Sequence, residues 1–251
     1  MNFLGIIPAR YSSVRFPGKP LALLGNKPVI QWVLERAGKA MENVYVATDD
    51  ERIFQAVKKF GAKAVMTSGK HPSGTDRCAE ALNIISLETG THFDCVINVQ
   101  GDEPFISPLQ IQALINCFQD AKTDIATLAK KITSREEISD PNKPKVVFDK
   151  SNFALYFSRS PIPYIRNAGT DITTGSHNIF RHIGIYGYRS DVLKELSHLK
   201  PSPLELAESL EQLRWLQNGY KIKVSLTDLD NLGIDTPEDL IEAERRVAGH
   251  S

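Results

Sequence analysis

The sequence predicts an α/β fold with a mainly parallel, Rossmann-like sheet, helices on both of its faces and an inserted β-rich lobe. Short β-rich runs alternate with helical patterns through the first half of the chain, as they do in βαβ units. The second half has β-rich runs but no long helical pattern between residues 146 and 183. We therefore expect a single domain over residues 1–251, with the lobe at about residues 145–190.

The elements of the first half follow from their hydrophobic patterns. Short apolar runs predict strands at residues 3–7, 44–48, 64–67 and 95–99. Apolar residues at spacings of three and four predict two amphipathic helices, one marked by Ile53, Val57 and Phe60 and the other by Ile111, Leu114, Ile115 and Phe118. These stripes face a core and carry no chemistry.

The second half is built differently. Strands are expected at residues 145–148, 154–157, 183–188 and 222–226. The polar segment 166–181, which contains Gly169 and Gly175, predicts a mobile surface loop. Leu206, Leu210 and Leu213 predict one helix, and Thr236-Pro237 predicts the N-cap and first position of the last helix.

Charge and cysteine content exclude several classes of function. The 251 residues carry 30 Lys and Arg against 30 Asp and Glu, so nothing favours a general attraction to nucleic acid or to an acidic membrane. Any bound anion must be held by a local cluster. Three cysteines without a CxxC pair indicate buried, reduced thiols in a cytosolic protein.

The first ten residues also exclude a targeting or membrane segment. They have no basic n-region, and their apolar run stops at Pro8 and Arg10, so they predict neither a signal peptide nor a membrane span. We expect a cytoplasmic protein with no membrane partner.

A loop suited to a polyanion follows the first strand. Residues 8–20 contain Arg10, Arg15 and Lys19, two serines and no acid. In open α/β sheets ligands lie beyond the carboxyl ends of the strands, where loop amides and cationic heads can hold a triphosphate. For the cations taken alone, a solvated basic turn is about as good an explanation as an anion site. The loop matches neither GxxxxGK[ST] nor GxGxxG.

The segment His71-Pro72-Ser73-Gly74-Thr75-Asp76-Arg77 is a second candidate. Ser73 and Gly74 allow a close backbone approach, and Thr75 can cap the helix that follows. A capping turn explains Thr75 but leaves Arg77 without a role.

Paired acids complete the candidate site. Residues 96–104 form an apolar run that ends in Gln100-Gly101-Asp102-Glu103. A second acid, Asp235, precedes the last helix, whose cap is already supplied by Thr236. Mg²⁺ commonly takes one or two protein carboxylates and completes its shell with phosphate and water. Asp102 and Asp235 are therefore the candidate metal ligands, although a strand-end Asp is as often a turn former.

Together these segments resemble the sugar-acid nucleotidyltransferases, which open with a strand, Pro-Ala-Arg and a later Lys. Tyr11 and Pro17-Gly18-Lys19-Pro20 are more similar to the 3-deoxy-manno-octulosonate (Kdo) cytidylyltransferases than to the sialic acid enzymes. The matching segments run from the first strand to the last helix. The resemblance implies a fold of the nucleotide-diphospho-sugar transferase type and transfer of CMP from CTP to Kdo with Mg²⁺. The product would serve lipopolysaccharide biosynthesis, and the lobe would form a homodimer interface.

The resemblance also assigns roles to residues. It implies a nucleotide site at Pro8, Ala9, Arg10, Arg15, Lys19, Ser73, Gly74 and Gln100. It implies sugar-acid contacts at Arg77, Gln100, Arg159, His182, Tyr186, Glu211 and Gln212. Catalysis would rest on Arg10, Lys19, Asp102 and Asp235.

Without the resemblance, the residues of the later segments also have purely structural interpretations. The default interpretation of Arg159 is an arginine on the surface of a strand. Alternation places His182, Gly184, Tyr186 and Tyr188 on one strand face, where a single His is more often structural than functional. A helix within residues 201–214 would place Glu208, Glu211 and Gln212 on one face, which is ordinarily a solvated one.

Two other functions remain in competition. A sialic acid cytidylyltransferase would perform the same chemistry on a nine-carbon acid. A non-catalytic nucleotide-binding protein would keep the fold, but it has little use for two metal-holding acids. The sequence does not distinguish Kdo from a modified form such as the 8-amino sugar.

Overall fold

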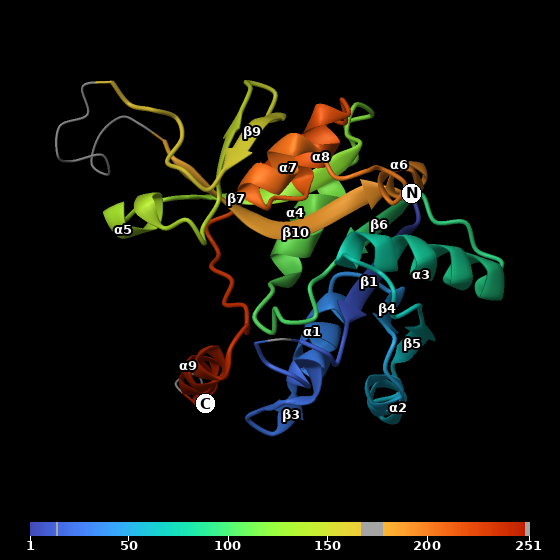
Figure 1. Ribbon diagram of the computed structural model, residues 1–251. Coiled ribbons are helices and arrows are strands. Elements are labelled where there is room, and N and C mark those ends of the chain that lie inside the picture. The colour runs from blue at the N-terminus through green and yellow to red at the C-terminus, as the bar shows by residue number, and fades with distance from the viewer. Residues whose placement is uncertain (14, 167–177, 249–251) are drawn as a thin grey trace. The chain divides into compact units, whose positions relative to one another are not determined.

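The computed structural model describes the chain except residues 14, 167–177 and 249–251 (Figure 1). The chain forms two compact units. The first comprises Met1–Gln112, Gly187–Ser197 and Asn231–Ser251, and the second comprises Ala113–Tyr186 and His198–Asp230. The expected loop at 166–181 lies mostly outside the described residues, and its end was placed wrongly because Phe180 and Arg181 already belong to a strand.

A parallel sheet forms the centre of the first unit. Strand β1 (Phe3–Ala9) lies between β4 (Val44–Thr48) and β6 (Cys95–Asn98), and β5 (Lys63–Met66) follows β4. All three pairings are parallel. The described part of the chain thus confirms the predicted fold class, with strand ends shifted by one or two residues. Ile6, Val46 and Ile97 are fully buried in this sheet.

The helices of the first unit pack on this sheet and on one another. They are α1 (Val29–Gly38), α2 (Glu51–Lys59), α3 (Gly74–Thr89), α6 (Ser190–Leu196) and α9 (Pro237–Ala248). Between β1 and α1 the chain makes a single 3₁₀ turn, η1 (Lys19–Leu21), and a short hairpin of β2 (Leu23–Leu24) and β3 (Lys27–Pro28).

One predicted helix cap is confirmed and another is wrong. The Thr236 hydroxyl accepts a hydrogen bond from the Asp239 amide at 3.3 Å, as expected for the N-cap of α9. Helix α3, however, begins at Gly74 and is capped by Ser73, whose Oγ accepts from the Asp76 amide at 3.2 Å. Thr75 is therefore already inside the helix, where it is buried.

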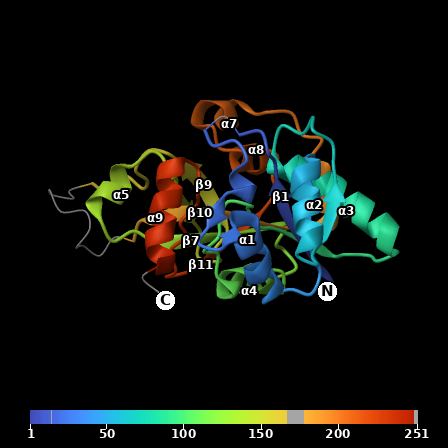
Figure 2. The same ribbon diagram turned by 90° about the horizontal axis from the view of Figure 1, so that it is seen from below.

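Helix α9 is held against the start of the chain by an apolar cluster. Leu24, Val29, Ile234 and Ala243 are its buried members, and partly buried side chains that include Trp32 surround them. Figure 2 shows α9 beside α1, as this cluster requires. Packing of an amphipathic face is the main source of stability for a helix of this length.

The second unit is rich in strands. It contains β7 (Ile125–Lys131), β8 (Lys145–Phe148), β9 (Ala154–Ser158), most of β10 (Phe180–Arg189) and β11 (Ile222–Leu226). β11 pairs with β7 in parallel, whereas β8 pairs antiparallel with β9 and β10. Its short helix α5 (Arg135–Ser139) follows β7, and α4 (Pro108–Cys117) begins in the first unit.

The single helix predicted from Leu206, Leu210 and Leu213 is wrong. The structure has two short helices, α7 (Pro203–Glu208) and α8 (Gln212–Gln217), separated by Ser209 in a left-handed conformation with φ 50°. Since the break changes the direction of the chain, Glu208, Glu211 and Gln212 do not share one helical face.

The cysteines and the helices agree with a chain that has no disulfide and no membrane span in its described part. Cys78, Cys95 and Cys117 are free and buried. Burial raises the pKa of Cys95 to about 12 and that of Cys117 to about 11, so neither thiol is an effective nucleophile near neutral pH. Among the described residues, no helix is both long and apolar enough to cross a bilayer.

Candidate functional site

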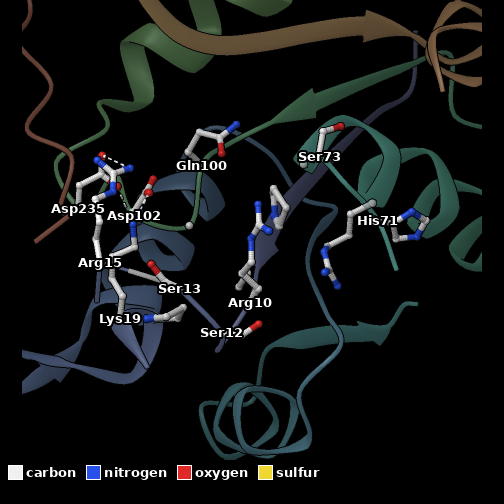
Figure 3. A pocket seen from close by; sticks show the side chains of 16 residues that line it. Arg10, Ser12, Ser13, Arg15, Lys19, His71, Ser73, Gln100, Asp102 and Asp235 are labelled. Carbon is white, nitrogen blue, oxygen red and sulfur yellow. Dashed lines mark hydrogen bonds and ion pairs between the residues drawn. The ribbon is translucent and has the colours of Figure 1, made fainter. Parts of the chain in front are cut away.

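A cavity of about 440 Å³ opens in the first unit beyond the carboxyl ends of β1 and β6 (Figure 3). Its volume lies within the range of small-molecule sites. It brings together these residues of the predicted site: Pro8, Ala9, Arg10, Arg15, Lys19, Ser73, Gly74, Arg77, Gln100, Asp102 and Asp235. In Figure 3 the two acids lie with Arg15 and Lys19 at one side, whereas Ser73 and His71 lie at the other.

The opening loop is shaped by its backbone. The Gly18 amide donates to the Tyr11 carbonyl oxygen at 2.8 Å, and Gly18 has a φ of 73° that a side chain would strain. Lys19 then begins the 3₁₀ turn with its side chain largely buried, while Arg10 at the end of β1 is exposed. The loop thus presents one cation from each of its ends to the cavity.

Lys19 joins the two candidate metal ligands. Its Nζ lies 2.6 Å from Oδ2 of Asp102 and 3.1 Å from Oδ1 of Asp235. A further ion pair joins Arg15 to Asp235 at 3.3 Å. Two carboxylates therefore converge on one cationic centre although they are far apart in sequence.

The backbone explains why the two acids meet. The Ile234 amide donates to the Asp102 carbonyl oxygen at 2.8 Å. The Asp239 carboxylate accepts from the amides of Asp235 and Thr236, each at 2.8 Å. Burial raises the pKa of Asp239, but these amide bonds, together with the Thr236 side chain and the charge of Lys19, outweigh it and the net pKa is lowered. A charged Asp239 thus fixes the turn that presents Asp235.

This arrangement fits a divalent cation with hard ligands. Two carboxylates that already share one ammonium group can share a metal ion, and the remaining ligands of Mg²⁺ are commonly water and phosphate oxygens. The described residues contain no cluster of three or more His, Cys, Asp or Glu side chains suited to a metal. Such an ion would therefore depend on oxygens from its substrate.

Gly101 allows the two strand ends to approach closely. A Cβ at this position would lie 2.8 Å from the carbonyl oxygen of Pro8, a backbone atom of β1. We expect Gly101→Ala to lower the free energy of unfolding by about 1–3 kcal/mol, because overpacking forces the backbone to shift. Urea unfolding measures this change.

Gly38→Ala provides the matched control for Gly101→Ala. Nothing lies within 4 Å of a Cβ at Gly38, and alanine is the better helix former. Its stability should be unchanged or slightly higher. Equal stability of the two variants would show that the contact between Gly101 and Pro8 is not tight.

The far side of the cavity is set by the start of α3. The Ser73 hydroxyl donates to Asp76 Oδ2 at 2.6 Å. The Arg77 side chain is buried, where it donates to the Thr67 hydroxyl at 2.6 Å and forms an ion pair with Asp49 at 3.2 Å. Arg77 thus reaches the cavity but already has an anionic partner.

Sequence reasoning did not select Ser12, Ser13, Pro20, His71 and Gly101, which also line the cavity. All five lie within the segments singled out above. The contact between His71 Nε2 and Glu80 Oε2 at 2.5 Å had no signal in the sequence, because residues nine apart do not face each other in one regular element.

Comparisons with known proteins show the family of this chain. A family model described as Cytidylyltransferase matches residues 4–222. A 3-deoxy-manno-octulosonate cytidylyltransferase of Bacteroides thetaiotaomicron is 56% identical over 100% of both chains. This chain belongs to that family of cytidylyltransferases.

Two further relatives refine the comparison. The solved structure of a CMP:2-keto-3-deoxy-manno-octonic acid synthetase complexed with CTP has a TM-score of 0.91 and 42% identity, with 100% of each chain covered. An 8-amino-3,8-dideoxy-manno-octulosonate cytidylyltransferase of a Shewanella species is 47% identical over 99% of each chain. The family thus includes relatives that are named for different sugar acids.

The other predicted sugar contacts of this cytidylyltransferase lie in the second unit. The Arg159 side chain donates to three backbone carbonyl oxygens, those of Pro141, Glu208 and Ser209, at 2.8, 2.6 and 3.2 Å. The Arg159 amide donates to the Glu208 carboxylate at 2.9 Å. Arg159 therefore holds the end of α7 in place.

His182 and Tyr186 belong to an aromatic cluster in the second unit of the cytidylyltransferase. The His182 ring lies 5.0 Å from that of Phe157 and 5.4 Å from that of Tyr186, which in turn contacts Trp215 at 5.0 Å. Burial lowers the pKa of His182 to about 3, so its imidazole is neutral. It lies 2.9 Å from the Thr127 hydroxyl.

The remaining pair lies at the start of α8. Glu211 accepts from Arg214 at 3.1 Å, and the neighbouring Gln212 is buried. Both residues are held by the short helix rather than by the long one predicted.

Proposed function

We propose that this cytidylyltransferase transfers CMP from CTP to the anomeric 2-hydroxyl of 3-deoxy-D-manno-octulosonate, giving CMP-Kdo for lipopolysaccharide biosynthesis and releasing pyrophosphate. The observation that carries the proposal is the convergence of Asp102, Asp235 and Lys19 beside the basic opening loop. Hard oxygen ligands next to cations suit a metal-bound triphosphate. The relatives named above support the choice of nucleotide and sugar.

Transfer needs no covalent intermediate with the protein. A lone pair of the sugar hydroxyl oxygen forms a bond to the α-phosphorus, the bond from that phosphorus to the bridging oxygen breaks, and its electron pair leaves with pyrophosphate. The hydroxyl proton passes to water. Catalysis then rests on alignment of the two substrates and on neutralisation of phosphate charge.

The residues of the cavity divide these tasks. We assign Arg10 and Lys19, with Arg15, to the triphosphate. Asp102 and Asp235 would hold Mg²⁺, which when bound polarises the phosphate and lowers the pKa of the attacking hydroxyl.

The two substrates would occupy further residues. The nucleotide would also contact Pro8, Ala9, Ser73, Gly74 and Gln100. The proposed sugar-acid contacts, which rest on the family resemblance, are Arg77, Gln100, Arg159, His182, Tyr186, Glu211 and Gln212.

We also propose that the enzyme works in the cytoplasm as a homodimer, with residues 145–190 of its single nucleotidyltransferase domain as the interface. The dimer is what the family resemblance implies; within this lobe the side chains of Leu155 and Tyr164 are exposed, at 63% and 90%. The buried, free cysteines suit a reducing compartment.

Substrate choice tests the proposed function directly. With CTP and Mg²⁺ the enzyme should form CMP-Kdo, and far less product should appear with sialic acid or when ATP or GTP replaces CTP. Product mass separates the outcomes, and the 8-amino sugar should be included because one relative is named for it. Equal turnover of sialic acid would contradict the proposal.

A further inference from the structure

The Tyr11 ring contacts Arg52 and Gly18 near the start of the opening loop, and it does not line the cavity. The Arg52 guanidinium carbon lies 3.3 Å from the centroid of the Tyr11 ring, which places a cation on one ring face. The ring also packs on Gly18, where an added Cβ would lie 3.0 Å from the ring carbon Cζ. The amide of Gly18 is bonded to the Tyr11 carbonyl oxygen as well.

Arg52 is itself fixed in position. Its Nε and Nη2 donate to the Asp50 carboxylate at 2.9 and 2.6 Å. Asp50 also caps α2, because its Oδ1 accepts from the Arg52 amide at 2.9 Å. The Arg52 side chain is the largest cause of the lowered pKa of Asp50. The guanidinium that contacts the tyrosine ring is thus also bonded to the N-cap residue of α2.

The contact between Tyr11 and Gly18 joins the two parts of the loop that carry its cations. Tyr11 follows Arg10 and Gly18 precedes Lys19, so one ring fixes both ends of the loop that carries the two cations. The distance between these cations must match the spacing of the phosphates if both are to bind.

We propose that Arg52 and Tyr11 are positioning residues that hold Arg10 and Lys19 in register for the triphosphate. This inference rests on the proposed function, in which the loop binds CTP. Neither residue lines the cavity, so both act through the loop. If the Arg52 side chain only holds the Asp50 carboxylate at the start of α2, its loss would lower stability without changing CTP binding.

The test compares Arg52→Met, Tyr11→Leu and Tyr11→Phe in the full-length enzyme. Lys58→Met is the matched control, because Lys58 also lies on α2 and also contacts an aromatic ring, that of Phe54 at 5.6 Å. The readouts are the Kd of CTP by calorimetry, kcat and KM for CTP, and Tm.

Arg52→Met should raise the Kd and KM of CTP about two- to five-fold, as expected for the loss of an exposed cation–π contact. Tyr11→Leu should raise them about ten-fold, because it removes the ring from both of its neighbours. Tyr11→Phe and Lys58→Met should match the natural enzyme, and kcat should change less than KM throughout.

Lys19→Ala separates the two possible failures. If Lys19→Ala weakens CTP binding but Arg52→Met and Tyr11→Leu do not, the loop binds CTP without the positioning contact and this inference is wrong. If none of the three weakens CTP binding, the proposed triphosphate site is wrong as well. A fall in Tm alone for Arg52→Met would show that the Arg52 side chain only supports the Asp50 carboxylate that caps α2.

Discussion

Asp102→Asn and Asp235→Asn should each lower turnover by at least about a hundred-fold, because each removes one of two charges proposed to hold the metal ion. Stability should change little. Asn keeps the size and the hydrogen-bonding capacity of Asp, and Lys19 keeps one carboxylate partner in each variant. The double variant should be little worse than the single ones, since residues that act as a unit are strongly non-additive.

Pyrophosphate release at varied Mg²⁺ measures the kinetic effect, and calorimetry with Mn²⁺ and CTP measures metal binding without turnover. Asp120→Asn is the matched control, because Asp120 also forms an ion pair, with Lys223 at 3.0 Å, and does not line the cavity. A folded Asp235→Asn enzyme with near-normal activity would remove Asp235 from the proposed metal site.

Lys19→Ala should impair the use of CTP by about ten- to a hundred-fold, which is the typical loss for one charge-assisted hydrogen bond to a phosphate. The expected fall is in kcat/KM for CTP. The fold should persist, because the two carboxylates freed by the substitution are partly exposed and can be hydrated.

Steady-state kinetics with varied CTP and a thermal unfolding curve check the Lys19 variant. Lys27→Ala is its control, because Lys27 also pairs with a carboxylate, that of Glu35 at 2.7 Å, but lies outside the cavity. Unchanged kinetics in Lys19→Ala would show that the opening loop does not bind the triphosphate.

The meeting of Asp102 and Asp235 illustrates what the sequence could predict. One acid follows the buried strand β6 and the other precedes α9, and ligands of an open parallel sheet are expected beyond the carboxyl ends of its strands. The bond from Ile234 to Asp102 that brings them together was not predictable, because it depends on tertiary packing of α9.

The errors have equally local causes. Leucines at spacings of three and four predicted one helix through residues 206–213, but periodicity carries no signal for the left-handed Ser209 that divides it. Both Ser73 and Thr75 are good N-cap residues. Ser73 is the cap because its backbone is extended and the helix begins at the next residue, Gly74. The hydrogen-bond partners of Arg159 and His182 could not be predicted from the sequence pattern, because they belong to other secondary-structure elements.

The packing of α9 also constrains how the protein is made. Asp235 and the helix that anchors it come from the last stretch of the chain, whereas their partners Lys19 and Asp102 come from its first half. The first unit is discontinuous in sequence and includes residues from Asn231 onward. Because synthesis proceeds from the N-terminus, a nascent chain on the ribosome can form β1, β4 and β6 early but can complete the carboxylate pair only after α9 has emerged.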